Sequence, residues 1–286
     1  MNGSEFCYPE GKGLKACKTK PIGDWNKADA LEQLEKNKKR LFELQDMLYA
    51  QGKYALLVIL QGMDTSGKDS AIKHVMTGLN PQGIRVTGFK SPTVTELKHD
   101  YMWRTDRELP SKGEIGIFNR SYYEDVLIVR VHELVPGHDM NDREFWKMRF
   151  RQIRHKEEYL LENHIIPMKF FLNISKEEQT SRLLKRIDDP SKNWKFDISD
   201  MKERAYWPDY VTAYEDCFEH TSTKQAPWYI VPADKKWYAR LVISELMIKQ
   251  LEELKLSYPK ISDEQKKNLQ NCRATLLQEQ EERNLG

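Results

Sequence analysis

The 286-residue sequence has no apolar run of the roughly 18 residues that a membrane-spanning helix needs, so we expect no membrane partner. No signal-peptide pattern opens the chain, and a cytoplasmic location is the default expectation. The formal net charge is only +2, because 46 lysines and arginines oppose 44 acidic residues. This balance argues against a nucleic-acid partner and confines any functional basic surface to a local patch.

Cysteine is also scarce, with four residues in the whole chain, and no two of them form a C-x-x-C pair. No histidine cluster lies near any of them. A zinc site or a disulfide framework is therefore not expected. Free thiols in a reducing compartment are the simpler interpretation for Cys7, Cys17, Cys217 and Cys272.

Short apolar segments rich in β-formers alternate with helical patterns along most of the chain. We expect strands near residues 54–60, 84–89, 115–118, 166–172 and 228–231. Helices are expected at residues 27–51, 68–78 and 142–163, from Asp234 onward, and after the capping boxes Thr93/Glu96, Ser175/Glu178 and Asp200/Glu203. This alternation predicts an α/β fold in which a parallel five-stranded sheet carries helices on both faces.

Three parts of the chain differ in composition. Residues 1–25 are polar with glycine and proline, and are expected to form an irregular arm. Residues 26–258 would form the main domain, and residues 259–286 a charged tail or an exposed helix. The first helical pattern of the main domain has leucines on one face that would pack on the domain or on a second subunit, namely Leu31, Leu34, Leu41, Leu44 and Leu48.

Gly62, Gly67 and Lys68 match the phosphate-binding loop G-x-x-x-x-G-K-[ST], between an apolar strand and a helix. Glycines let the backbone N–H groups curl around an anion, and the helix adds its positive end. Lys68 would neutralise phosphate oxygens. We therefore predict phosphate binding rather than a structural glycine turn, with Met63, Thr65 and Ser66 as the other loop contacts.

Two carboxylates make this loop unusual. Asp69 replaces the usual Ser or Thr, so the ordinary hydroxyl ligand of Mg²⁺ is missing. Asp64 lies inside the loop, where a carboxylate should repel phosphate unless it faces Mg²⁺ or accepts the proton of an attacking hydroxyl. The alternative is a helix-end carboxylate satisfied by local N–H groups. We favour the catalytic interpretation.

The segment 119–125 follows the third expected strand and should lie near the phosphate loop, because ligands bind beyond the carboxyl ends of parallel strands. Arg120 can neutralise phosphates with its planar fork of donors. Glu124 and Asp125 could hold Mg²⁺ directly or through water. Asn119 stands where an ordinary Walker B strand ends in aspartate. A helix N-terminus with an acidic first turn is the competing interpretation, and both can hold together.

A basic segment follows the fourth expected strand. Arg182, Lys185 and Arg186 share one helix face, and the polar insertion 188–196 comes next. In small kinases such a segment closes over the phosphates and excludes water, so we expect a lid at about residues 182–200. A solvated basic face is the alternative. Lys147, Arg151 and Arg154 form another basic stripe. A long anionic substrate could bind along it, or the stripe could simply face solvent.

Together these motifs resemble the polyphosphate kinases of family 2. The resemblance covers most of residues 25–258 and implies a P-loop kinase fold of the thymidylate-kinase type. It is carried by residues 61–69, 118–125, 129–132, 186–190, 194–196, 226–229 and 231–238. The combination at 119–121 and 124–125 looks most like the subgroup that phosphorylates both nucleoside mono- and diphosphates.

The resemblance implies reversible phosphoryl transfer between inorganic polyphosphate and AMP or ADP to give ATP, with GDP as a further acceptor. Mg²⁺, or Mn²⁺ in its place, would be organised by Asp64 and Glu124, and the acceptor would lie towards Lys90 and Pro92. Polyphosphate would lie on the loop against Lys68, Arg120, Arg182 and Arg186. The remaining expected binding residues are Asp69, Asn119, Ser121, Tyr123 and Trp194. The family resemblance also implies a homo-oligomer, either a dimer or a tetramer.

Two other functions stay open on the sequence. An ATP-dependent nucleotide or nucleoside kinase of the same fold shares every motif up to Lys68. A nucleotide-regulated P-loop binding protein is the second alternative, and it is disfavoured because a basic lid suits transfer better than switching. Turnover by the purified protein separates these classes.

Overall fold

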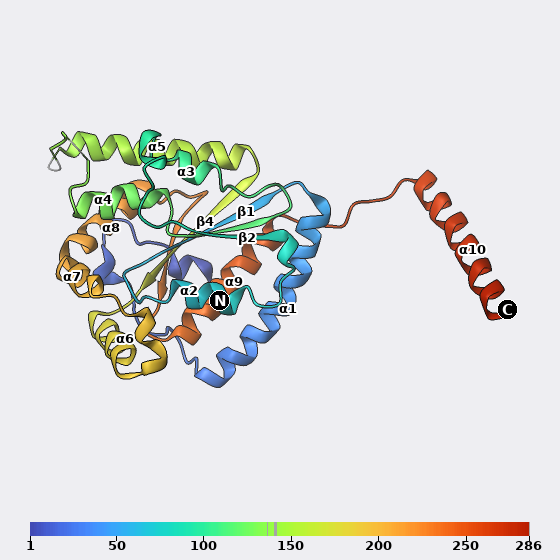
Figure 1. Cartoon of the computed structure of the whole chain (residues 1–286), viewed down its shortest axis with the longest axis horizontal. Helices are drawn as coiled ribbons and strands as arrows, with labels where there is room; N and C mark the ends of the chain where they lie inside the picture. The colour runs from blue at the N-terminus through green and yellow to red at the C-terminus, as the bar shows by residue number, and fades with distance from the viewer. Residues whose placement is uncertain (136, 140–141, 286) are drawn as a thin grey trace. The chain divides into compact units, whose positions relative to one another are not determined.

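The computed structural model describes residues 1–135, 137–139 and 142–285 (Figure 1). Its centre is an all-parallel five-stranded sheet with the order β2-β3-β1-β4-β5. The strands are β1 (Ala55–Gln61), β2 (Ile84–Gly88), β3 (Ile115–Asn119), β4 (Ile165–Asn173) and β5 (Trp228–Pro232). The predicted parallel α/β sheet is therefore confirmed, and no strand end differs from its expected position by more than one residue.

Helices cover both faces of this sheet (Figure 1). One face carries α1 (Lys27–Gln51), α2 (Lys68–Val75) and α9 (Lys236–Glu253), and the other carries α5 (Arg143–Glu162) and α8 (Trp207–Thr221). Shorter or connecting helices are α3 (Trp103–Asp106), α4 (Ile128–Val131), α6 (Lys176–Asp188) and α7 (Ser199–Ala205). Residues Met1–Leu256 form one compact unit, and Ser257–Gly286 form a second, whose helix is α10 (Asp263–Leu285).

Helix α1 has clear sequence reasons for its two ends. The side chain of Asn26 accepts hydrogen bonds from the backbone N–H groups of Ala28 and Asp29, and Gly52 closes the helix at a φ of 59°. Residues 26–29 also match N-K-x-D, a guanine-recognition pattern in some P-loop proteins. Because Asn26 serves here as a helix cap, we assign the pattern no base-binding role.

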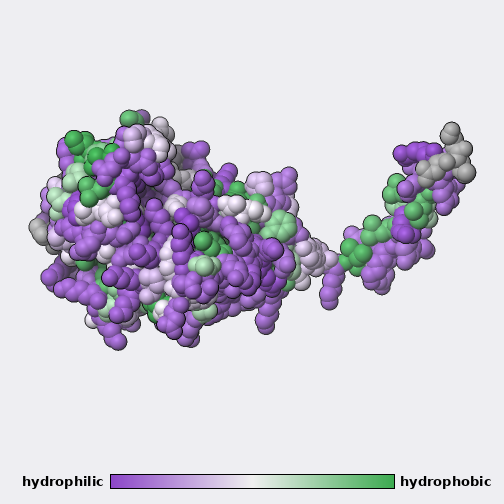
Figure 2. Space-filling model, turned by 90° about the horizontal axis from the view of Figure 1, so that it is seen from below, coloured by the Kyte–Doolittle hydropathy of each residue, from purple (hydrophilic) through white to green (hydrophobic). Residues whose placement is uncertain are grey.

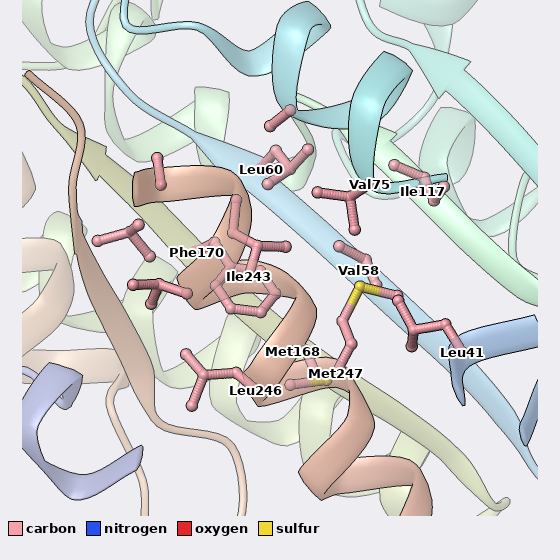
Figure 3. Packing of buried hydrophobic residues seen from close by; sticks show 14 of the residues in the cluster. Leu41, Val58, Leu60, Val75, Ile117, Met168, Phe170, Ile243, Leu246 and Met247 are labelled. Atoms are coloured by element: carbon pink, nitrogen blue, oxygen red, sulfur yellow. The ribbon is translucent and has the colours of Figure 1, made fainter. Parts of the chain in front are cut away.

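The core on this face joins α1, α2 and α9 to the sheet (Figure 3). Alternate residues of β1 and β4 point into it, including Val58, Leu60, Met168 and Phe170. Leu41, Leu44 and Leu48 of α1 pack in this core, and Leu34 is also buried. Leu31 is 39% exposed, so it does not belong to the buried stripe.

The opposite face is aromatic. Phe118, Phe171, Phe218 and Trp228 are buried there together with residues of α5 and α8. The N-terminal arm also reaches the protein interior. Phe6 is 2% exposed, and the backbone of Cys7 forms an isolated antiparallel β-bridge with Tyr229 of β5. Figure 2 shows a mainly hydrophilic surface on which hydrophobic residues form small separate groups. Among the described residues, no helix is long and apolar enough to cross a membrane.

Two expected helix starts are wrong. Thr93 and Glu96 make both hydrogen bonds of a capping box, but only a 3₁₀ turn follows, at Glu96–Lys98. Asp200 lies inside α7 instead of capping it, because that helix already begins at Ser199. At Thr93 the cap is present without a following α-helix, whereas at Asp200 the helix forms without the expected cap.

Candidate active site

The phosphate loop connects β1 to α2 at the carboxyl edge of the sheet. Gly62 has a φ of 150°, and a Cβ atom there would lie 2.7 Å from Ser66 Oγ and 3.0 Å from the Leu172 carbonyl oxygen. Gly67 has a φ of 109° and directly precedes α2. Both positions therefore require glycine, for backbone conformation and, at Gly62, also for space.

Two hydroxyl groups in the loop lack partners. Thr65 Oγ1 and Ser66 Oγ are buried and have no hydrogen-bond partner among the described residues. Buried polar atoms are nearly always paired, so unpaired ones in a loop of this shape indicate a ligand that supplies acceptors. Phosphate oxygens fit that requirement.

Lys68 is held along the inside of the loop. Its Nζ donates hydrogen bonds to the carbonyl oxygens of Gly62, at 2.6 Å, and Met63, at 3.3 Å. Burial lowers the pKa of Lys68, and the nearby Asp64 carboxylate acts in the opposite direction. The ammonium group therefore has a fixed position beside the loop before any ligand binds.

Arg120 brings two carboxylates together. It follows β3 with a left-handed φ of 66°, an uncommon conformation for a residue other than glycine and one found often at functional sites. Its Nη2 lies 3.4 Å from Asp64 Oδ1, and its Nη1 lies 4.0 Å from Glu124 Oε2. The phosphate loop and the segment 119–125 thus meet at this guanidinium, as expected.

Glu124 and Asp64 provide oxygen ligands of the kind that Mg²⁺ prefers. Burial raises the pKa of Glu124, while Arg120 and Lys68 oppose that rise. Among the described residues there is no cluster of three or more potential protein ligands. Magnesium sites commonly use one or two carboxylates and complete the shell with water and substrate phosphates, so this pair fits such an ion.

Asp125 does not join that pair. Its Oδ2 lies 3.2 Å from Arg149 Nε, and burial raises the pKa of Asp125 to about 6. Glu124 and Asp125 are consecutive in the chain, but their carboxylates point to different partners, Arg120 and Arg149. The expectation that both hold Mg²⁺ is not supported for Asp125.

The two departures from the usual loop pattern contact each other. Asn119 Nδ2 donates to Asp69 Oδ1 at 2.6 Å. Ordinary P-loop enzymes have a hydroxyl residue at the helix start and an aspartate at the strand end, whereas here the helix start carries a carboxylate and the strand end an amide. One oxygen of Asp69 is therefore held by Asn119, and both residues line the cavity that contains the phosphate loop, so both remain predicted binding residues.

Three cavities surround Arg120. The basic cavity, of about 750 Å³, contains the phosphate loop and the basic residues of α6. The lid cavity, of about 300 Å³, lies between Asp64 and residues of α7 and α8. The apolar cavity, of about 500 Å³, is lined by Lys90, Pro92, Ser121 and Glu124, among others. Lys90 lines both the basic and the apolar cavity.

Two basic residues of this site were missed by sequence reasoning. Lys73 on α2 and Lys236 at the start of α9 line the basic cavity, together with Lys185 of α6, which the sequence had already placed in the basic segment. Burial and the neighbouring Arg182, Arg240 and Arg186 lower the pKa of Lys236. The position of Lys236 in a helix that directly follows the fifth strand could have pointed to it, because that helix start lies at the same sheet edge as the phosphate loop.

Arg182 differs from its expected role. Its Nη1 donates to the carbonyl oxygens of Thr65 and Ser66, its Nη2 to those of Ala233 and Asp234, and its Nε to Glu178. All five N–H donors of the guanidinium are therefore used by the protein. Arg182 supports the loop from beneath and has no donor left for phosphate.

Two further expected ligand contacts do not face the cavities. The side chain of Tyr123 is fully buried and its hydroxyl donates to Glu157, so it is not accessible to a nucleotide. Trp194 is 78% exposed, and its indole N–H donates to the Ser191 carbonyl oxygen. Both residues were predicted from their position in a motif, which does not specify side-chain direction.

The expected lid is connected to the site by polar contacts. Arg186 Nη1 pairs with Asp200 Oδ2 at 2.9 Å, which joins α6 to α7. Arg204 of α7 donates to Gln179 Oε1, and Gln179 donates to the Asp64 carbonyl oxygen at 3.1 Å. A short chain of hydrogen bonds thus joins this segment to the phosphate loop.

The second basic stripe lies on α5, away from the loop. Lys147 pairs with Glu144, and Arg154 donates to the His220 carbonyl oxygen. Neither these two nor Arg151 lines the basic cavity. A long anion in that cavity would meet the cations of α2, α6 and α9 instead.

Comparison with known proteins agrees with this geometry. Residues 24–259 match the family described as Polyphosphate kinase 2. The chain is 50% identical over 252 residues to an ADP-polyphosphate phosphotransferase of Rhodopseudomonas palustris, covering 86% of this chain and 87% of that one. It is 47% identical to an AMP/ADP-polyphosphate phosphotransferase of Meiothermus ruber, covering 82% and 85%.

A solved structure has the same fold. The crystal structure of Polyphosphate Kinase 2 from Arthrobacter aurescens TC1 superimposes with a TM-score of 0.86 at 42% identity, covering 92% of this chain and 94% of that one. The sequence match over residues 24–259 includes both the phosphate loop and the segment 119–125, and the solved structure shares the fold that carries them. The chain therefore belongs to the polyphosphate kinase 2 family and is a phosphotransferase.

Proposed function

We propose that this enzyme transfers phosphoryl groups reversibly between inorganic polyphosphate and AMP or ADP, and that the latter yields ATP. The observation that carries the proposal is the charge of the basic cavity. Among the described residues, ten lysine and arginine side chains and three carboxylates line it. A single triphosphate does not need that many cations, whereas a long polyanion does.

The two relatives support both acceptors. One is named for ADP and the other for AMP and ADP, and both align with more than four fifths of this chain. GDP is proposed as a further acceptor, as the resemblance to the family implies.

We place polyphosphate in the basic cavity and the nucleotide in the apolar cavity, with its phosphates near Lys90. The two cavities meet at Arg120, which lines both. A phosphoryl group would therefore pass between substrates beside this guanidinium. Arg120 and Lys68 would neutralise the charge that spreads over the transferred group.

Asp64 and Glu124 would hold Mg²⁺, or Mn²⁺ in its place. When bound, the ion would neutralise phosphate charge and supply no redox chemistry. Asp64 would also orient the attacking phosphate oxygen, which is already ionised at neutral pH and needs no strong base. Alignment and charge neutralisation thus account for catalysis, and exchange of one phosphoanhydride for another makes the reaction nearly balanced.

We also propose a lid at residues 182–200, a cytoplasmic location, no nucleic-acid partner, and a dimer or tetramer. The buried leucines of α1 pack within the chain, so a subunit contact on this helix would use its exposed apolar residues. These are Leu31, Phe42 and Tyr49. Light scattering on the wild type and on Phe42→Glu tests this contact, which is excluded if both have the same mass.

The function itself is tested by ATP formation. Purified protein is mixed with ADP, Mg²⁺ and long-chain polyphosphate, ATP is measured by luminescence, and Lys68→Ala serves as the control against contaminating kinases. ATP well above that control supports the proposal. An ATP-dependent nucleoside kinase predicts no ATP here, and rapid ADP release from ATP and a nucleoside instead.

A further inference from the structure

A buried lysine lies in the middle of the sheet on the aromatic face. Lys169 of β4 has an exposure of 0%. Its Nζ donates to Glu157 Oε2 at 2.6 Å, to the Thr221 carbonyl oxygen at 2.7 Å and to the Tyr123 hydroxyl at 3.2 Å. The three N–H donors of the ammonium group thus all have partners.

The partner carboxylate binds two tyrosines. Glu157 Oε1 accepts hydrogen bonds from the Tyr123 hydroxyl at 2.7 Å and from the Tyr122 hydroxyl at 3.0 Å. Tyr122 and Tyr123 are the first two residues of the 3₁₀ turn Tyr122–Val126, and Glu124 is the third. One buried carboxylate oxygen therefore anchors the turn that carries the proposed metal ligand.

Stability alone is a poor explanation for this ion pair. Removing two charges from water is costly, and replacing a buried pair by apolar residues of similar volume is often neutral or stabilising. Apolar residues would suit the site, since Phe171 of the same strand and Trp228 of β5 belong to the surrounding aromatic core. What an apolar pair could not provide is the two directed hydrogen bonds to the turn.

Glu124 needs an anchor of this kind. The cation nearest to its carboxylate, Arg120, lies 4.0 Å away, beyond hydrogen-bond distance. Besides a hydrogen bond from the Gln61 side chain, the direction of this carboxylate is therefore set by the turn that carries it.

We propose that the buried Lys169–Glu157 pair is a positioning device that fixes the Tyr122–Val126 turn and so aims Glu124 at the metal. This inference rests on the proposed role of Glu124 as a metal ligand. Lys169 and Glu157 touch no substrate and act only through the two tyrosine hydroxyls. On the other side of the turn, Ser121 Oγ accepts from the Tyr123 N–H and completes the anchor.

The test removes the hydroxyls and keeps the rings. The variants are Tyr122→Phe and the double variant Tyr122→Phe/Tyr123→Phe. The matched control is Tyr238→Phe, because the hydroxyl of Tyr238 donates to the Ile22 carbonyl oxygen at 3.1 Å from a buried ring on the opposite sheet face. Melting temperature, kcat, the Mg²⁺ concentration for half-maximal activity, and Mn²⁺ binding by electron paramagnetic resonance are measured for each.

We expect Tyr122→Phe and Tyr238→Phe to lose similar, small amounts of thermal stability, and the double variant to lose more, because it also removes the two hydrogen bonds of the Tyr123 hydroxyl. Only the tyrosine pair should change the metal response, with about a tenfold rise in the half-maximal Mg²⁺ concentration and in the Mn²⁺ dissociation constant, as for other residues that orient metal ligands. KM for polyphosphate should not change, since the basic cavity is untouched.

Equal metal responses in the double variant and in Tyr238→Phe would overturn the proposal and leave the pair a structural feature. If the double variant does not fold, Tyr122→Phe alone gives the same comparison, because it loses a single hydrogen bond. Wild-type protein that forms ATP but binds no Mn²⁺ also overturns the proposal. A wild type that binds Mn²⁺ but forms no ATP contradicts the proposed function instead.

Discussion

The phosphate loop and the proposed lid both supply cations to the basic cavity, but they are held in different ways. Arg182 Nη1 donates to the Thr65 and Ser66 carbonyl oxygens of the loop, while its Nη2 holds the β5–α9 connection beside it. Gly62 is packed against Ser66 and the end of β4. The lid is joined by the pair of Arg186 and Asp200, and its Trp194 is 78% exposed. The loop is thus preorganised, while few buried contacts oppose opening of the lid.

This difference matches what phosphoryl transfer requires. The groups that neutralise the transferred phosphate must be in position before reaction, because reorganising them would add to the barrier. The segment that excludes water must open for substrate entry and product release. We therefore expect loop variants to lose catalysis or folding, and lid variants to lose mainly substrate affinity.

The largest effect is expected for Lys68→Ala. The side chain lies on the loop and is proposed to neutralise phosphate, so kcat should fall at least about a thousandfold while the melting temperature changes little. Single-turnover kinetics and thermal unfolding on the same preparation measure both. Near-normal turnover in a folded variant would contradict the assignment of the loop.

Asp64→Asn should have the next largest effect, with kcat lower by about a hundredfold and a higher Mg²⁺ requirement, because the substitution keeps the size but removes the charge facing Arg120. Activity is measured over a Mg²⁺ titration. If Asp64 is only a helix-end carboxylate satisfied by local N–H groups, stability should fall slightly and kcat should stay unchanged.

Arg182→Leu should act through folding. It leaves four backbone carbonyl groups of the loop and of the β5–α9 connection without donors, so the free energy of unfolding should fall by about 3 kcal/mol. Urea unfolding measures this loss. If stability is unchanged and only KM for polyphosphate rises, Arg182 binds substrate, as the sequence first suggested.

Arg186→Ala should have the smallest effect. KM for polyphosphate is expected to rise about tenfold, the size of one lost charge-assisted hydrogen bond, with little change in stability or in KM for the nucleotide. Steady-state kinetics with each substrate varied in turn separate the two. Identical kinetic constants in variant and wild type would exclude Arg186 from the donor side.

Local patterns predicted the strands and the phosphate loop well. Alternation, glycine spacing and the lysine after Gly67 act within a few residues, so a linear sequence is sufficient to read them. The expected helix start at Thr93 failed because a local cap alone does not stabilise a helix, and the one at Asp200 was misplaced because α7 begins one residue earlier without that cap. Lys236 was missed because it is distant in sequence from the loop and reaches the cavity only through the strand order.

The sequence by itself determined which groups this protein carries for phosphate chemistry, since glycine, lysine and carboxylate act through their own conformational freedom and charge. Only the tertiary structure decided which of them face the site. Glu124 and Asp125 are neighbours in the chain, yet one lies by Arg120 and the other by Arg149. The direction of a side chain depends on the turn that carries it, and here that turn is anchored by residues of α5 and β4 that no local pattern connects to it.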